Sequence, residues 1–539
     1  MTTRTKEAPL IITRAFGTMK KPPAPGSPPR RGRLSMHSVH KWGGLISALW
    51  LAVLGITGFL LDHRDWRWIW QTPAPQLLVP DRILEKERAA GFMVYRINLK
   101  NPRVRLAAGK RGLFSDTGAG WRKAQFIGLV DAPQVFDVME DTRHGWDRLY
   151  AATDDGLWIS VNNGEWFTPY ALAGEFINAI APGSTDEEVV LAAGRSGLYI
   201  LNTDTMEVRS LHLSPAGHSV AAGEIGLSRF VRDLHYGRGI VSGFGSLLIN
   251  DIGGILFILL SLTGFAFWLA PRLWKRKEHR ARHESRMIHR KTMKFLHRSH
   301  GLYMGVFAII PVVYLSITGI VIDHSDALMG WMKTISVPRQ YLPPVYDLNS
   351  WDGEIFSVMG YSGQPEKISI GARSGLYTST DSGKSWVLEK LPGAPSCFAW
   401  SLARINGGVF LGGMGCSNYY MNSAGDWTAV KGSGHMAASA GVLPGGKLGL
   451  LSHGALKSGV IGGEFTTSPV DFPALGSPPL FVLIEGLHNG LLIHPQWIWV
   501  NDAVSAAAII LCFTGLVRII RFRRIIARDF SLTAGNPSQ

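Results

Sequence analysis

The stretch that decides the fold runs from His37 to His63 and reads HSVHKWGGLISALWLAVLGITGFLLDH. Its apolar part, Trp42–Leu61, has about the 20 residues that a helix needs to cross a bilayer. Histidines lie at both ends, and His40 and His63 are about 35 Å apart on a helix that rises roughly 1.5 Å per residue. They therefore belong to two different sites, and ionisable groups at the ends of a span indicate metal or heme binding at both membrane faces.

A copy of this stretch runs from His297 to His324 and reads HRSHGLYMGVFAIIPVVYLSITGIVIDH. Both open with HxxH, carry Thr-Gly near the far end and close with Asp-His. Two further apolar runs, Gly245–Leu269 and Trp497–Val517, each follow an LHxG motif and contain an Asn-Asp and a Thr-Gly pair. The chain is therefore a tandem duplication, and we predict a four-helix transmembrane bundle with pseudo-twofold symmetry.

The charge of the chain is concentrated in three segments. The net charge is +15, and residues 1–41, 271–298 and 518–539 together contain 25 Lys or Arg and four acids, a net +21. The remainder is therefore about −6, which is 15 − 21. Lys and Arg gather on the cytoplasmic side of membrane proteins, so this pattern predicts cytoplasmic termini and excludes a nucleic-acid-binding surface.

The predicted organisation alternates spans with large soluble lobes. We expect a disordered cytoplasmic tail (1–36), a first span (37–63), β lobe 1 (64–230), an LHxG segment with the second span (231–270), a basic cytoplasmic loop (271–298), a third span (299–324), β lobe 2 (325–480), an LHxG segment with the fourth span (481–518) and a cytoplasmic tail (519–539). Both lobes then face the periplasm of a Gram-negative cell, and the lipid bilayer surrounds the spans.

The two lobes consist of short β-type runs separated by turn residues. A Gly-rich motif recurs every forty-odd residues, which is the period of four-stranded propeller blades. It reads GLFSDTGAGW at Gly112–Trp121, GLWISVNNGEW at Gly156–Trp166, GRSGLYILNTD at Gly194–Asp204 and GARSGLYTSTDSGKSW at Gly371–Trp386. Its D-x-G-x-x-W part resembles the Asp-box of sialidase-type propellers, in which the aspartate caps backbone amides, so Asp116 is expected to have a structural role.

Three repeat units in a lobe are too few to close a ring. We therefore expect the two lobes to form one propeller of six to eight blades, or a pair of half-propellers, so that the β domain is all-β and propeller-like. The chain has three cysteines. Cys512 lies in a span, and Cys397 and Cys416 either pair in an oxidising compartment or remain free thiols.

Eight histidines occupy matched positions in the two halves. They are His37, His40, His297 and His300 on the inner side, and His63, His235, His324 and His488 on the outer side. Two neutral imidazoles from facing helices hold a low-spin heme, so one heme near each face makes an electron path across the membrane.

The pairing of these histidines is open in part. The two residues of each HxxH lie on one helical face, so either of them can bind iron. His40 and His300 are nearer the apolar core than their partners in the motif. On the outer side, His235 and His488 enter from the second and fourth spans, and His63 competes with His235 for the same site.

The Asn-Asp pairs of the second and fourth spans are Asn250-Asp251 and Asn501-Asp502. A carboxylate within a membrane span is costly and usually functional. These side chains either hydrogen-bond a ligand histidine, hold the region of a heme propionate or relay protons, or they join neighbouring helices. The Thr-Gly pairs permit close helix packing and leave room for a porphyrin edge.

The two histidine-bounded spans, together with the two LHxG…TG segments, resemble the PepSY-associated transmembrane helix family. The resemblance implies a bacterial inner-membrane protein with two b-type hemes, similar to ferri-siderophore reductases. Electrons then pass from a quinone or a cytoplasmic reductase to a periplasmic ferric siderophore or another metal complex. The resemblance places ligands at His40, His300, His235 and His488. No PepSY module is evident, because the Asp-box lobes stand in its place.

Two functional hypotheses follow from these observations. The first is a heme-dependent ferric-siderophore or metal reductase whose electron donor is a separate protein or a quinone, since the sequence contains no nucleotide-binding fingerprint. The second is a non-enzymatic membrane-anchored protein whose β domain recruits a periplasmic partner or binds a metal ion.

Overall fold

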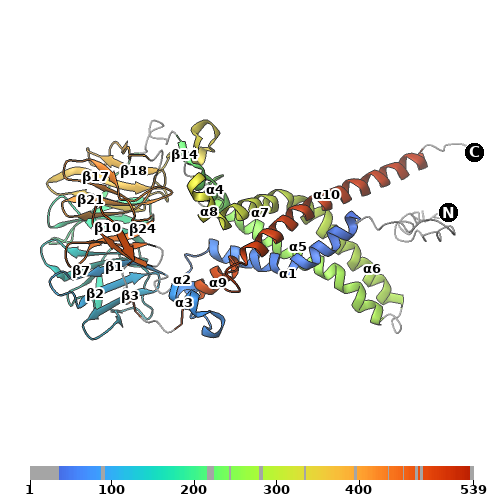
Figure 1. Ribbon diagram of the computed structural model, residues 1–539, viewed down its shortest axis with the longest axis horizontal. Coiled ribbons are helices and arrows are strands. Elements are labelled where there is room, and N and C mark those ends of the chain that lie inside the picture. Colours follow the sequence, from blue (N-terminus) through green and yellow to red (C-terminus); the bar gives the residue numbers. More distant parts are fainter. Residues whose placement is uncertain are drawn as a thin grey trace, which may run out of the picture.

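The chain forms a β domain joined to a long helical part (Figure 1). The computed structural model describes residues 35–86, 91–214, 224–241, 244–277, 283–332, 335–393, 397–434, 436–452, 455–467, 472–473 and 477–534. Most of the expected tail 1–36 and the end of the tail 519–539 lie outside these residues. The start of α1 and the end of α10 lie at the end of the helical part away from the β domain (Figure 1).

The helical part contains long apolar helices and short helices that connect them to the β domain. The long helices are α1 (Met36–Asp62), α5 (Phe244–Lys277), α6 (His283–His297), the π-helix η5 (Arg298–Gly305), α7 (Ile309–Asp323) and α10 (Ile498–Ala534). The short α-helices are α2 (Arg67–Gln71), α3 (Asp81–Lys86), α4 (Leu227–His235), α8 (Ser325–Met332) and α9 (Leu480–His488), and the 3₁₀ turns are η2 (Gln76–Leu78), η6 (Arg339–Tyr341) and η7 (Pro344–Tyr346).

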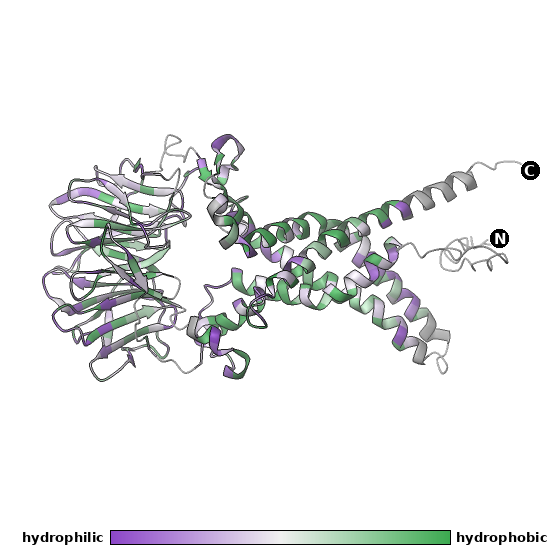
Figure 2. Cartoon of the chain, viewed as in Figure 1, coloured by the Kyte–Doolittle hydropathy of each residue, from purple (hydrophilic) through white to green (hydrophobic). Residues whose placement is uncertain are grey.

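Three helices, α1, α5 and α10, are long and apolar enough to cross a membrane, and α6–η5 with α7 makes a fourth span if the bent pair counts as one. Figure 2 shows the apolar residues concentrated in this part of the chain. The helices pack α1 on α5, α5 on α7, α7 on α10 and α10 on α1. Small residues permit the close crossing of α1 and α5, because a Cβ on Gly55 would lie 2.7 Å from the backbone oxygen of Gly254.

The third predicted span differs from the other three because it is bent. Met287–Gly305 and Ile309–Asp323 meet at an angle of 63°. Pro311 lies just after this break, and a proline ring removes one backbone hydrogen bond and clashes with the carbonyl of the residue four positions earlier. The break therefore lies directly before a residue that disfavours an uninterrupted helix.

The β domain contains, within the described residues, six antiparallel sheets that follow one another along the chain. The strands are β1 (Phe92–Ile97), β2 (Val104–Gly109), β3 (Gly112–Thr117) and β4 (Arg122–Lys123); β5 (Gln125–Phe126), β6 (Val135–Asp141), β7 (Gly145–Thr153), β8 (Gly156–Ser160) and β9 (Trp166–Ala171); β10 (Ile177–Pro182), β11 (Glu188–Ala193), β12 (Gly197–Asn202) and β13 (Val208–Leu211); β16 (Ser357–Tyr361), β17 (Gln364–Ala372), β18 (Gly375–Ser379) and β19 (Val387–Leu388); β20 (Phe398–Ile405), β21 (Gly408–Met414), β22 (Tyr419–Met421) and β23 (Trp427–Ala429); and β24 (Ala437–Val442), β25 (Leu448–Ser452), β26 (Ala455–Gly459) and β27 (Phe465–Thr467). Among the strands in the described residues, only the short pairing of β5 with β9 is parallel.

Each sheet packs against the next, and the last packs against the first. The contacts run from β1 and β2 to β6, from β6 to β10, from β10 to β16, from β16 to β20, from β20 to β24 and from β24 back to β1. Apolar clusters fill the spaces between neighbouring sheets, with Ile370, Val190 and Trp351 in one of them. Three sheets come from each half of the chain, and a small sheet of β14 (Glu224–Gly226) with β15 (Ser336–Pro338) also joins the halves. The prediction of a large all-β domain is confirmed.

Side-chain caps close the turns of the Gly-rich motifs. Asp116 Oδ1 accepts the backbone N–H groups of Gly118 and Gly120, both at 2.9 Å. Gly118 adopts a φ of +102°, which a residue with a Cβ rarely takes. Ser379 Oγ accepts the N–H of Gly383 at 2.8 Å in the corresponding turn of β18. The predicted capping role of Asp116 is thus confirmed, and the aspartate serves the fold.

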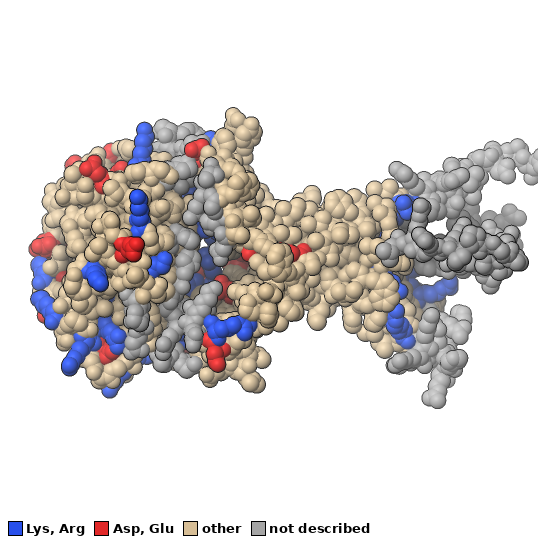
Figure 3. Space-filling view, viewed as in Figure 1, with Lys and Arg blue, Asp and Glu red and all other residues tan. Residues whose placement is uncertain are grey.

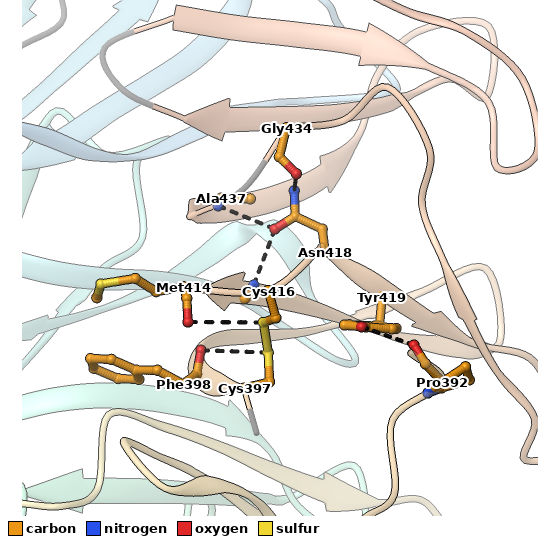
Figure 4. The surroundings of a disulfide bond; sticks show 10 residues. Pro392, Cys397, Phe398, Met414, Cys416, Asn418, Tyr419, Gly434 and Ala437 are labelled. Carbon is orange, nitrogen blue, oxygen red and sulfur yellow. Dashed lines mark hydrogen bonds between the residues drawn. A yellow bond between two sulfur atoms is a disulfide. The ribbon is translucent and has the colours of Figure 1, made fainter. Parts of the chain in front are cut away.

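A disulfide joins Cys397, just before β20, to Cys416 in the turn after β21 (Figure 4). Next to it, Asn418 Oδ1 accepts the N–H of Gly413 at 3.1 Å, and its Nδ2 donates to Ser433 Oγ at the same distance. Of the two alternatives for these cysteines, the bonded one is present, and Cys512 is the free thiol.

Candidate functional site: four histidines on four Thr-Gly pairs

Four of the eight predicted histidines contact the four Thr-Gly pairs of the apolar helices. Each imidazole Nδ1 lies within hydrogen-bond distance of a threonine Oγ1 on another helix. The pairs are His40–Thr514 at 2.9 Å, His300–Thr263 at 2.9 Å, His235–Thr318 at 3.0 Å and His488–Thr57 at 2.9 Å. These are the same four histidines that the family resemblance selected.

The threonines also determine which ring nitrogen carries the proton. Each hydroxyl donates to a backbone carbonyl of its own helix; Thr57 Oγ1, for example, donates to Val53 O at 2.7 Å and Thr318 Oγ1 to Tyr314 O at 2.9 Å. Since the hydroxyl proton is used there, the threonine oxygen accepts the N–H of the imidazole. We infer that these histidines are neutral with the proton on Nδ1, so that the Nε2 lone pair is available to a metal.

The glycine after each threonine accommodates the imidazole ring. A Cβ on Gly58 would lie 3.3 Å from His488 Cε1, and one on Gly264 would lie 3.3 Å from His300 Cε1. The equivalent distances for Gly515 to His40 and Gly319 to His235 are 3.4 and 3.6 Å. Each ring therefore lies against the backbone of the partner helix, most tightly at Gly58 and Gly264.

The inner pair consists of His40 on α1 and His300 on η5. Their ring centroids are 6.3 Å apart and the ring planes are inclined by 77°. The π-helical turn belongs to this site because His300 lies within it, and π-turns in helices often mark functional sites. Gly305 ends that turn, where a Cβ would lie 2.6 Å from His300 O.

The outer pair consists of His235 and His488, which lie at the ends of the short helices α4 and α9. The sequence placed them at the entrance of the second and fourth spans, but each short helix folds back, α4 onto α7 and α9 onto α1. Gly237 and Gly490 make this reversal possible with φ values of +69° and +75°. The LHxG motif is thus a helix end that carries the histidine, followed by the glycine at which the chain reverses.

The asparagines of the Asn-Asp pairs hold these helix ends in place. Asn250 Nδ2 donates to His235 O at 2.9 Å, and Asn501 Nδ2 donates to His488 O at 3.3 Å. Burial, with a smaller contribution from the nearby His488, lowers the pKa of His235 to about 4. Burial also lowers the pKa of His488 to about 4, so both imidazoles are neutral at physiological pH.

The other four histidines make different contacts. His324 Nε2 lies 2.7 Å from Asp502 Oδ2, and His63 Nδ1 lies 3.6 Å from Asp251 Oδ1. The aspartates therefore pair with His63 and His324 and not with the histidines on the Thr-Gly pairs. His37 lies on α1 about one turn before His40, nearer the N-terminus of the helix. The ring centroid of His297 is 6.0 Å from that of Phe267.

The threonines were not predicted as partners of the histidines. The sequence nevertheless contained a signal, because each of the four apolar runs carries one Thr-Gly pair and each half carries one HxxH and one LHxG motif. The four Thr-Gly pairs and the four histidine motifs are thus equal in number and recur at matched positions in the two halves.

A family model described as the PepSY-associated TM region matches residues 37–354, more than half of the chain. The chain belongs to this family. It is therefore a PepSY-associated membrane protein, and the match includes α1, α5 and α7 together with the first three sheets of the β domain.

Solved structures similar to this PepSY-associated protein are distant. The extracellular domain of a hybrid two-component system of B. thetaiotaomicron has a TM-score of 0.36 at 11% identity, covering 72% of this chain and 34% of that chain. PorZ, a surface component of the type-IX secretion system of Porphyromonas gingivalis, has a TM-score of 0.34 at 10% identity, covering 71% and 33%. This chain thus spans about a third of those structures. No curated protein matches it.

Proposed function

We propose that this protein is a membrane electron carrier that holds two b-type hemes, one between His40 and His300 and one between His235 and His488. The observation that carries the proposal is the fourfold His–Thr–Gly arrangement. Each of the four imidazoles has its Nδ1 within hydrogen-bond distance of a threonine hydroxyl. A proton held on Nδ1 there leaves Nε2 to bind a metal. Bound heme supplies a one-electron redox centre at each pair.

The spacing of the inner pair supports this assignment. Two imidazoles that bind one metal through Nε2 at about 2 Å have ring centroids roughly 6 Å apart. The centroids of His40 and His300 are 6.3 Å apart. The chain's own residues hold and orient these ligands, because each threonine accepts the Nδ1 proton and each glycine admits the ring.

The two sites lie at different depths of the helical part. His40 and Thr57 both belong to α1, and Thr57 marks the outer site because it contacts His488. The 17 positions between them (57 − 40) correspond to about 25 Å along a helix. Two redox centres at this separation would carry electrons from a donor on the basic, cytoplasmic side to an acceptor on the side of the β domain. The acceptor we favour is a ferric siderophore or another metal complex.

The β domain is then the periplasmic platform that receives the acceptor. We propose that its six sheets are the blades of one propeller, since each sheet packs on two neighbours and the last contacts the first. Three blades from each half complete the ring. The hairpins between the second and third strands of each sheet then face the helices and the outer histidine pair.

The test is an absorption spectrum and a heme assay of the full chain, purified in detergent after heme-replete expression. We expect two hemes per chain, with a Soret band and sharp α and β bands after reduction. His40→Ala and His235→Ala should each remove one heme, whereas the exposed His494→Ala should remove none. A colourless wild-type protein would refute the proposal and favour a non-enzymatic β-domain protein that recruits a partner.

A further inference from the structure

A cluster of basic side chains lies where the β domain faces the outer histidine pair. Its members come from the end of α1, from α4 and its C-terminal turn, and from hairpin turns of three different sheets. We call this set the basic cluster; it comprises Arg64, Lys110, Arg195, Arg229, Arg232, Arg238 and Arg373. Figure 3 shows a recess between the β domain and the helical part, in which both basic and acidic side chains are visible.

These cations lie close enough to affect one another. Burial, and then the nearby charge of Arg64, lowers the pKa of Lys110 to about 8. Burial, followed by Arg64 and Arg373, lowers the pKa of Arg238 to about 10. Like charges inside a partly buried recess repel each other more strongly than they would in water.

The acids near the cluster do not balance it. Asp65 lies 3.4 Å from Lys110 Nζ, Glu354 lies 3.9 Å from Arg373, and Asp233 pairs with Arg229 at 3.3 Å. Asp62, at the end of α1, is the fourth nearby carboxylate and also faces Arg238. Seven cations and four carboxylates leave a surplus of three positive charges in the recess.

Buried guanidinium atoms in the cluster lack a partner. Arg229 is only 4% exposed, and its Nη1 has no hydrogen-bond acceptor within the described part of the chain. The Nε of Arg373 is likewise buried without one. An unpaired buried donor of this kind is costly, and the cost is removed when an anionic ligand accepts the hydrogen bond.

Aromatic rings hold two of the guanidinium groups in position. The guanidinium carbon of Arg195 lies 4.8 Å from the ring centroid of Phe356 and 5.8 Å from that of Phe176. The guanidinium carbon of Arg373 lies 5.5 Å from the ring centroid of the same phenylalanine, Phe356. Arg195 and Phe356 also line a small cavity of about 60 Å³, together with residues from the first long strand of each of the six sheets. Fixed, separated cations of this kind match an anion with several carboxylates better than a single small anion.

We propose that the basic cluster binds a soluble polycarboxylate anion, such as a metal–citrate chelate, beside the outer histidine pair. Arg232 and Arg238 stand three residues before and after His235, so an anion held by the cluster lies next to that site. This inference rests on the proposed function, because it names the chemical class of the electron acceptor. Carboxylates have a second possible source here, namely the propionates of a bound heme, and the experiment separates the two.

The experiment is calorimetric titration of the full-length protein in detergent with gallium(III) citrate, which resembles ferric citrate but is not reduced. We expect binding that weakens at least about tenfold in Arg195→Gln and in Arg373→Gln, since each removes charge-assisted hydrogen bonds. Arg103→Gln, on an exposed turn between β1 and β2, is the matched control and should bind as the wild type does. A cationic ferric trihydroxamate should not compete.

Two results would overturn the inference. One is equal binding by the wild type and both cluster variants. The other is no gallium citrate binding by the wild type, together with a lost or shifted heme in Arg195→Gln and Arg373→Gln, which would assign the cluster to heme propionates. Thermal melting of each variant shows that it is folded. A protein without heme that still binds gallium citrate through these arginines would refute the proposed function and leave this inference standing.

Discussion

Replacing Thr514 by valine tests the inner site at its most specific contact. Valine has nearly the shape of threonine but cannot accept the Nδ1 proton of His40, which threonine accepts at 2.9 Å. The buried N–H would lose its partner, at a cost of about 1–3 kcal/mol. Removing such a hydrogen bond behind a metal ligand typically lowers affinity by about 10- to 100-fold. We therefore expect Thr514→Val to weaken heme binding at the inner site by that factor.

The assay is titration of heme-free protein with hemin, followed by redox titration of the reconstituted protein. The variant should bind one heme as tightly as the wild type and the other more weakly. Its inner heme should have a higher midpoint potential, because an imidazole without this hydrogen bond is a weaker electron donor to iron. Thr514→Ser should restore both properties, since serine keeps the acceptor oxygen.

A hydroxyl on a neighbouring helix provides the control. Ser316 is 3% exposed on α7, and its Oγ has no hydrogen-bond partner among the described residues. Ser316→Ala should leave both hemes and both potentials unchanged. If Thr514→Val binds two hemes with unchanged affinity and potential, or if Thr514→Ser behaves like valine, the assignment of His40 as a threonine-oriented ligand is wrong.

Three further predictions concern the fold. Gly55→Ala would place its Cβ 2.7 Å from Gly254 O and should cost about 1–3 kcal/mol of stability by separating α1 from α5. Gly44→Ala is the control, because its Cβ would lie 3.7 Å from the nearest atom, and it should not lower the stability. Thermal unfolding in detergent measures both variants. Cys397→Ser opens a disulfide that spans 19 residues, and the β domain should lose about 3 kcal/mol in denaturant unfolding, with no change on adding reductant to the variant. Hydrogen bonds from Ser385 lower the pKa of Asp381 to about 2 in the folded protein, so the stability that the Asp381 carboxylate contributes is present above the usual carboxyl pKa and is lost as the pH falls towards 2. Asp381→Asn should therefore lower the melting temperature at pH 7. A difference in melting temperature between wild type and variant that stayed constant down to pH 2 would contradict this reasoning.

The main features of the fold were visible in the sequence because they depend on local patterns. The run from Trp42 to Leu61 is apolar throughout and helical in the structure. The Gly-rich motif around Asp116 marks a hairpin turn, and a hairpin is closed by residues that are neighbours in the chain. The bend before Pro311 was missed, although proline carried the signal, because its effect depends on where the preceding helix ends.

The details of the site were less accessible because they depend on contacts between distant parts of the chain. The matched positions of His40 and His300 indicated a pair, and the structure places their rings 6.3 Å apart. Neither residue's partner could be read from spacing alone, since Thr514 is far from His40 in the sequence and only the packing of α10 on α1 brings them together. The LHxG segment was expected to lead directly into the second span, and its reversal at Gly237, which folds the short helix ending at His235 onto α7, was not predicted.

The duplication explains why the site is built in this way. Every His–Thr contact crosses from one half of the chain to the other, since His40 and His235 of the first half meet Thr514 and Thr318 of the second. His300 and His488 of the second half meet threonines of the first half in return. Each candidate site therefore joins two equivalent histidines, and neither half contains a complete one. Such pairing of equivalent groups is what twofold-related subunits provide, and under the proposed function each heme would be held by one histidine from either half of the chain.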